Sequence, residues 1–365
     1  MNRHALALAV IFSAINISAS DGAPVPEESS TTIKPVAYPL VMYTPETSLM
    51  LGGGAVFVLR EKGEAATAKP DNITINAIYT TKSQAVLQML PEFYLLSEKL
   101  KVKGSMLYMD MPTSYFGTGN NGGMSYSAIK SREEKYTNRT LMFQPQATYA
   151  LWGALRAGMS WDLKNTSIRN KAQGGELAGN TVTGGRGGIL SGLGPVLEYD
   201  SRDNIFYPRE GLFAQAVTRL YRKALGSEYS YNYYALDLRG YREMRDGQVL
   251  ALQFAAAAAG QDVPFYDMPL YDLRGIYNSY FMNRAAYSAQ AEYRFKTGNK
   301  FYAVIFAGAG NTAPGAGKLS LKDPQFSGGA GLRYRLDEEE KINFRLDVGV
   351  SKWGVEPYFG ITEAF

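Results

Sequence analysis

Side chains that act as nucleophiles, general bases or zinc ligands are scarce in this chain of 365 residues. Its one histidine is His4, which lies in a stretch that we expect to be removed, and it has no cysteine. Ser-His and Cys-His nucleophilic pairs are thereby excluded, and so are zinc sites built on these residues. Neither a Gly-x-Ser-x-Gly elbow nor a phosphate-binding loop occurs. We expect no catalytic residue, no metal site and no cofactor.

Acidic side chains are the remaining candidates for chemistry. Asp200, Asp203 and Asp237 would suit calcium, but they lack an ordered ligand spacing. The acidic run 337–340 is typical of a solvated turn, with calcium or a basic partner as the minor alternative. The formal net charge is +4, and it falls to +3 once Arg3 is removed. A balance so close to neutral gives no reason to expect nucleic acid as a partner.

Polar and apolar residues alternate with a period of two along most of the chain. In the segment 343–351 the even positions are apolar and the odd positions are polar or glycine. In the segment 287–295 the odd positions are apolar and the even positions are polar. This alternation indicates β-strands with one apolar face. A soluble sandwich turns such a face inward, whereas a membrane barrel turns it toward lipid.

The length of the alternating runs favours the membrane barrel. A tilted membrane strand needs about 9–11 residues, whereas strands in soluble sheets usually have about 5–6. The sequence therefore predicts an all-β fold, a transmembrane antiparallel β-barrel of about 16 strands. The longest gaps between strands are 110–133, 165–189 and 260–282. We expect all three on the extracellular side, because long and short connections alternate in such barrels.

The N-terminus has the pattern of a secretory leader, with a positive charge, an apolar run and small residues at 18–20. We predict a signal peptide over residues 1–20. The alternative is a membrane anchor, but a spanning helix needs about 20 apolar residues. A flexible periplasmic tail is predicted over residues 21–34, which are rich in Pro, Ser, Thr and Glu. The outer membrane barrel would then occupy residues 35–365.

The last predicted strand covers residues 354–365. Phe359, Ile361 and Phe365 share one face of it, and a terminal aromatic on the lipid face resembles the C-terminal recognition signal of outer membrane barrels. Glu363 interrupts this apolar face. We expect Glu363 to lie at the level of the lipid headgroups, where a charge costs little.

Four segments, in chain order, resemble the BamA/TamA-like outer membrane β-barrel superfamily, also called the bacterial surface antigen family. The first is 43–54, which is similar to the opening hairpin, and the last is the C-terminal run 328–365. The second is similar to the family's hairpin motif and contains Asp200, Arg202, Asp203, Asn204, Pro208 and Gly211. The third is similar to the long sixth loop and contains Leu273, Arg274, Gly275 and Ile276.

The resemblance implies that the long loop folds into the lumen and that Arg274 pairs with acids on the inner wall. A planar guanidinium suits this role because it binds carboxylates in a bidentate manner and stays charged. Gly275 would let the backbone approach the wall. The candidate partners on lumenal faces are Asp347, Glu292, Asp200 and Glu198.

Two departures from the family pattern affect this role. Ile276 replaces the usual aromatic residue, and the family's Phe-x-Asp-x-Gly strand has no acid in 306–310. Asp347 is therefore the preferred partner. The alternative is that Arg274 is a solvated loop residue.

The resemblance also implies a non-enzymatic protein of the Gram-negative outer membrane, reached by Sec export. Only residues 21–34 precede the first predicted strand, so the chain resembles the subgroup that lacks N-terminal periplasmic POTRA domains. The expected role is outer membrane biogenesis, through protein assembly, translocation or a lipid-linked function. The expected partners are outer membrane lipid and lipopolysaccharide, the barrel assembly machinery during insertion, and an unidentified periplasmic partner.

Three other functions remain open from the sequence. A passive channel for small solutes would use the polar lumen lined by Asn72, Thr74 and Asn76. An enzyme would need a site built from carboxylates or from serine and lysine. A surface or adhesion barrel would use the loops 110–133 and 165–189.

Overall fold

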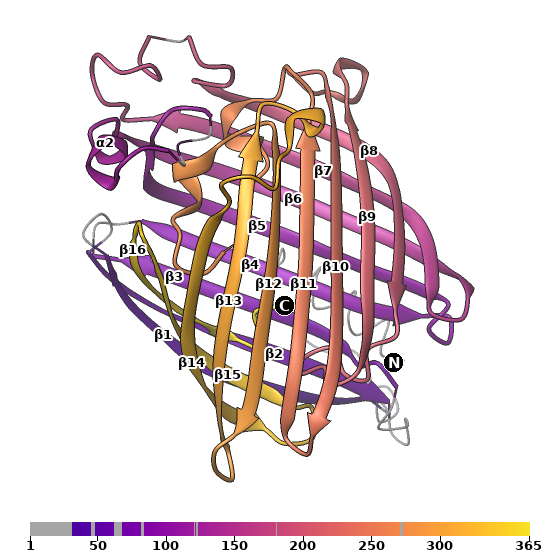
Figure 1. Ribbon diagram of the computed structural model, residues 1–365. Helices are drawn as coiled ribbons and strands as arrows, with labels where there is room; N and C mark the ends of the chain where they lie inside the picture. The colour runs from indigo at the N-terminus through magenta and orange to yellow at the C-terminus, as the bar shows by residue number, and fades with distance from the viewer. Residues whose placement is uncertain are drawn as a thin grey trace, which may run out of the picture.

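The computed structural model describes residues 31–44, 48–61, 68–81, 84–119, 121, 123–179, 181–270 and 273–365. In these residues sixteen strands follow one another in one antiparallel sheet, each hydrogen-bonded to the next. Figure 1 shows the sheet curving round into a barrel. The predicted all-β antiparallel barrel of 16 strands is confirmed. The predicted signal peptide, most of the predicted tail and the turn at 45–47 lie outside the described residues.

The elements have the following bounds. The strands are β1 (Thr31–Thr44), β2 (Ser48–Glu61), β3 (Asp71–Thr80), β4 (Ala85–Leu95), β5 (Leu100–Tyr115), β6 (Glu134–Trp152), β7 (Leu155–Arg169), β8 (Gly187–Asp200), β9 (Gly211–Tyr221), β10 (Tyr231–Arg245), β11 (Gln248–Ala259), β12 (Ala285–Lys296), β13 (Phe301–Ala313), β14 (Gln325–Asp337), β15 (Ile342–Ser351) and β16 (Gly354–Ile361). The helical segments are α2 (Tyr126–Lys130) and the 3-10 turns η1 (Lys223–Leu225), η2 (Phe265–Asp267), η3 (Asn278–Phe281) and η4 (Ala316–Lys318). None of the helices in the described residues is long and apolar enough to cross a membrane.

The outer ends of the first and last strands differ from the prediction. β1 begins at Thr31 and pairs with β2 from that residue onward, so the last four residues of the predicted tail belong to the sheet. β16 ends at Ile361 and not at Phe365. Thr362 has a φ of +63°, which turns the chain out of the extended conformation.

The connections alternate between the two ends of the barrel. The longest ones, 116–133, 170–186 and 260–284, all leave the end that we call the loop end, which carries α2 at the top of Figure 1. The start of β1 and the end of β16 lie at the other end, called here the terminal end. The sequence placed the three long connections on one side, as the structure does.

Apolar side chains cover the outside of the barrel. Leu87, Leu141 and Phe326 are 52%, 61% and 67% exposed. By contrast, Glu292 and Asp347 are completely buried on the inner face. Large apolar side chains outside and charges inside reverse the arrangement of a soluble protein, and they match a barrel that faces lipid.

The first and last strands meet at a seam. β1 and β16 approach each other, but no hydrogen-bonded ladder joins the described residues of the two strands. Near the terminal end, Val36 of β1 and Ile361 of β16 pack into one apolar cluster with Phe206. The seam is therefore held by side chains rather than by backbone hydrogen bonds.

Candidate functional site

The long connection 260–284 returns to the inner wall of the barrel. Its residues Leu273, Arg274 and Ile276 are buried, although they belong to a loop. Leu273 and Ile276 join an apolar cluster with Phe116 and Trp353 from two other loop-end connections. The predicted loop in the lumen is thus present, and the connection 116–133 covers it.

Arg274 lies between two carboxylates of the inner wall. Its Nη1 is 2.8 Å from Asp347 Oδ2 on β15, and its Nη2 is 2.7 Å from Glu292 Oε2 on β12. The guanidinium also lies over the ring of Phe306, 3.6 Å from its centroid. Two of the four predicted partners therefore reach Arg274, and the preferred one is among them. The arginine is a buried anchor of the loop and not a solvated residue.

Gly275 brings the loop backbone against β15. Its N–H donates to Tyr358 Oη at 2.8 Å, and its carbonyl accepts from Ser351 Oγ at 2.6 Å. Its φ is +100°, and a Cβ at this position would lie 2.7 Å from the backbone nitrogen of Val350. Any larger residue would be strained and would push the loop away from the wall.

Gly275→Ala should therefore lower the stability of the barrel by two additive effects. Left-handed strain costs about 1–2 kcal/mol, and the clash with β15 adds about 1–3 kcal/mol. Gly226→Ala is the matched control, because its φ is +87° and no described atom lies within 4 Å of the point that a Cβ would occupy there. Urea unfolding in detergent micelles should show a clearly larger loss for Gly275→Ala. Equal losses would contradict the close approach.

A second attachment holds the loop nearer to its start. The carboxylate of Asp267 is 2.5 Å from Lys164 Nζ on β7 and accepts a hydrogen bond from Tyr231 Oη at 2.6 Å. Lys164 in turn is 3.0 Å from Asp162. The sequence reasoning did not identify this site. Lys164 and Asp162 share a lumenal face by alternation, but nothing in the sequence links them to a residue about a hundred positions away.

Two arginines extend the Arg274 site toward the terminal end. Arg333 Nη1 is 2.5 Å from Asp347 Oδ1, and Arg333 Nε is 2.7 Å from Glu363 Oε2. Arg294 Nε is 2.7 Å from Glu292 Oε1. Both arginine side chains are fully buried. The loop and the residues after β16 are consequently bound to one continuous set of charges, which we call the lumenal arginine network.

The residues after β16 correct the predicted C-terminal signal. Phe359 and Ile361 lie in β16 as expected, but Phe365 does not lie on the lipid face. It is 5% exposed and packs against Tyr241 and Ala251, and its backbone oxygen accepts from Arg294 Nη2 at 3.0 Å. Figure 1 places the end of the chain inside the barrel.

Glu363 also lies inside the barrel and not at the level of the headgroups. Its carboxylate accepts from Arg333 Nε and, at 2.8 Å, from Asn343 Nδ2. Buried arginines require negative partners. This requirement explains why the chain leaves the strand at Thr362 and does not continue the apolar alternation.

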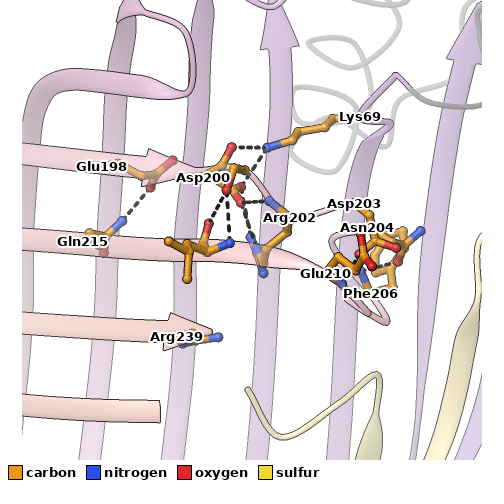
Figure 2. Close-up of polar contacts among 12 residues, drawn as sticks. Lys69, Glu198, Asp200, Arg202, Asp203, Asn204, Phe206, Glu210, Gln215 and Arg239 are labelled. Atoms are coloured by element: carbon orange, nitrogen blue, oxygen red, sulfur yellow. Dashed lines mark hydrogen bonds and ion pairs between the residues drawn. The ribbon is translucent and has the colours of Figure 1, made fainter. Parts of the chain in front are cut away.

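The hairpin motif builds the turn between β8 and β9. Asp200 accepts from Arg202 Nε at 2.8 Å and lies 2.9 Å from Lys69 Nζ, and both basic side chains point toward it in Figure 2. Asp203 Oδ1 accepts from the backbone N–H groups of Arg209 and Glu210 at 2.8 and 3.1 Å. These contacts shape the chain, so this part of the motif is structural.

Other residues of the motif complete the turn. Asn204 Oδ1 accepts from the N–H groups of Phe206 and Tyr207 at 2.8 and 2.7 Å. The carbonyl of Pro208 accepts from Arg294 Nη1 at 3.3 Å, which connects the turn to the lumenal arginine network. Gly211 begins β9 with a φ of +102°.

Glu198 and Asp200 are not partners of Arg274, contrary to one of the predicted possibilities. Glu198 lies 3.0 Å from Lys101 Nζ and 3.2 Å from Lys103 Nζ on β5. It also accepts a hydrogen bond from Gln215 Nε2 at 2.6 Å, as Figure 2 shows. Both acids face the lumen as predicted, but they lie on β8, where they pair with other basic residues, namely Lys101, Lys103, Arg202 and Lys69. The alternation predicted that both acids face the lumen. It could not predict which strands of the inner wall the loop with Arg274 contacts.

The site contains paired charges rather than a reactive group. In the part of the chain that the structure describes, no group of three or more His, Cys, Asp or Glu residues is arranged to hold a metal ion. Each buried arginine of the network lies against at least one carboxylate. Such an arrangement can fix a loop in the lumen, and it can release the loop when a charge is displaced.

Comparisons with known proteins show the fold. No protein-family model matches the sequence, and no curated protein matches it. The structure of BamA from Haemophilus ducreyi lacking POTRA domains 1-3 is similar with a TM-score of 0.53 and 12% identity, covering 98% of this chain and 78% of that chain. CdiB from Acinetobacter baumannii is similar with a TM-score of 0.55 and 10% identity, covering 91% of this chain and 59% of that chain.

CdiB from Escherichia coli is similar with a TM-score of 0.55 and 9% identity, covering 93% of this chain and 63% of that chain. This chain thus spans about three fifths of the length of the two CdiB structures. At identities this low the similarity is one of barrel architecture.

Proposed function

We propose that this protein is a non-enzymatic integral barrel of the Gram-negative outer membrane, of the BamA/TamA-like kind, that assists the assembly or translocation of other proteins. The observation that carries this proposal is the seam, where the described residues of β1 and β16 form no ladder. The apolar outer surface supports the membrane location. Its partners would be outer membrane lipid and lipopolysaccharide, an unfolded client chain, and the assembly machinery that inserts it.

An unpaired strand edge can bind another strand. Backbone N–H and C=O groups that lack a neighbour are available to an incoming chain, which adds to the sheet by β-augmentation. The seam of this barrel is closed by the cluster around Val36, Phe206 and Ile361. Separating these side chains breaks no ladder, so opening costs less here than between any other two strands.

A passive channel is the second candidate, supported by the buried polar residues of the lumen. The covering of both ends argues against it. Loops 116–133 and 260–284 pack together at the loop end. At the terminal end, Phe206 and Phe365 are buried inside the barrel. A conducting state would require these segments to move.

Reconstitution into proteoliposomes separates the two functions. The chain contains no cysteine, so Val36→Cys with Ile361→Cys allows the seam to be joined by a bifunctional thiol reagent. We expect the purified barrel to accelerate the folding of a second barrel protein, and the joined form to lose this acceleration. The same double variant without the reagent is the control. Ionic current without acceleration, or acceleration that persists after joining, would contradict the proposal.

A further inference from the structure

A cavity of about 550 Å³ lies inside the barrel beside the seam. Its size falls in the range of about 300–1,000 Å³ that is typical of small-molecule sites. Its walls are β1, β3, β4 and the start of β5, with residues 359–362 at the end of β16 on the other side and Phe206 at the terminal end. It is separate from the lumenal arginine network, and its polarity changes along the barrel axis.

The part of the cavity toward the loop end is apolar. Leu40 pairs with Gly52, Gly52 with Ile78, and Ile78 with Val86, so these residues form one row across four strands. Gly52 has no side chain to add to the row, and the backbone of β3 lies close against it, because a Cβ there would clash with the carbonyl oxygen of Ala77. Leu40, Ile78 and Val86 of this row line the cavity with apolar surface, as a hydrocarbon chain requires.

The part toward the terminal end is polar. Asn72 pairs with Glu92, and Glu92 with Lys103, in a row near the start of β3. Between the two rows, Asn76 receives a hydrogen bond from Tyr38 and donates to Gln88 at 3.2 Å. The cavity is therefore amphipathic, with its charged row toward the terminal end of the barrel and its apolar row toward the loop end.

Asn72 is a buried donor without a partner. It is 6% exposed and lines the cavity, and its Nδ2 forms no hydrogen bond within the described part of the chain. Burying an amide without a hydrogen bond costs free energy, about 1–3 kcal/mol in proteins. An ester or phosphate oxygen in the cavity would satisfy this donor. Lys103, which pairs with Glu198, and Glu92, which pairs with Lys101, place both signs of charge in the cavity wall. This balance suits a zwitterionic head better than an anionic one.

The seam connects the cavity with the membrane. Leu40 of β1 and Phe359 of β16 line the cavity from opposite sides, and the described residues of these strands form no ladder. We propose that the cavity binds a zwitterionic glycerophospholipid, with one acyl chain along Leu40, Ile78 and Val86 and the head beside Asn72 and Lys103. The lipid enters sideways through the seam. This inference rests on the membrane location proposed above.

Photo-crosslinking with the full-length barrel tests the proposal. The barrel is reconstituted in vesicles of phosphatidylethanolamine that carries a diazirine in one acyl chain, and the labelled residues are mapped by mass spectrometry. We expect labelling of the lumenal residues Ile78 and Leu90 as well as of outward residues. Val86→Trp fills the apolar row and should reduce lumenal labelling at least tenfold. Leu87→Trp, on the exposed outward face, is the matched control and should leave it unchanged.

A second pair of measurements tests the head site. Asn72→Leu should reduce lumenal labelling several-fold while the heat-modifiable folded fraction stays unchanged, and the anionic diazirine lipid phosphatidylglycerol should label the lumen less than phosphatidylethanolamine does. Labelling confined to outward residues would overturn the lipid site and leave the membrane location intact. Absence of labelling on every face would contradict the membrane location itself. Lumenal labelling by a barrel that fails to accelerate folding would contradict only the assembly function.

Discussion

Replacing Arg333 with alanine is expected to destabilise the barrel by about 3–5 kcal/mol, the cost of removing one partner from a buried ion pair. The Arg333 side chain is fully buried and lies 2.5 Å from Asp347 and 2.7 Å from Glu363. Its removal leaves two buried carboxylates with fewer positive neighbours. The midpoint of urea unfolding in detergent micelles, at an unchanged slope, measures the loss.

Two further variants test whether the loss of stability comes from the burial of the ion pair. Arg139→Ala also breaks an arginine–aspartate pair, with Asp110 at 2.8 Å, but the Arg139 side chain is 48% exposed. An exposed pair contributes about 0–1 kcal/mol, so the midpoint should hardly move. Arg333→Lys keeps the charge but cannot reach two carboxylates with one planar group, and it should be intermediate. Equal midpoints for Arg333→Ala and Arg139→Ala would show that the lumenal arginine network does not stabilise the fold.

The barrel was predictable because its main signal is local. The period of two in 343–351 depends only on neighbouring residues, and it identified Asp347 as lumenal before any pairing was known. Strand number and order follow from the same signal and from the short connections between strands. The inward position of Glu198 and Glu292 was predictable for this reason as well.

Partners across the lumen were not predictable, because alternation gives the face of a residue but not its position around the barrel. By this criterion Arg274 could pair with any of several lumenal acids. The acids that it does contact are determined by the place where the loop backbone meets β15, at Gly275. The sequence of 354–365 predicts one strand, because only Glu363 interrupts the apolar face that ends in Phe365. The chain nevertheless leaves the strand, because Glu363 binds the buried Arg333 and the backbone oxygen of Phe365 binds the buried Arg294.

Arg274→Ala is the second change with a large expected effect. Unlike Arg333→Ala, it is expected to change the ionic current as well as the stability of the barrel. The loop keeps its contact through Asp267 and its apolar contacts with Phe116 and Trp353. Only the segment next to β15 is released, so the stability loss should lie at the lower end of about 3–5 kcal/mol. Because Gly275 leaves the wall together with the arginine, ionic current through the reconstituted barrel should rise.

The measurements for this variant are the heat-modifiable folded fraction in lipid and the single-channel current. Arg284→Ala is the control within the same connection, because Arg284 forms no ion pair in the described residues.

Combining Arg274→Ala with Asp347→Asn tests whether Arg274 stabilises the barrel through its pair with Asp347. If Arg274 acts through Asp347, the double variant should lose less stability than the sum of the single variants, because the neutral amide no longer needs a cation. A folded fraction and a current that both stay at the wild-type level would remove Arg274 as the anchor of the loop.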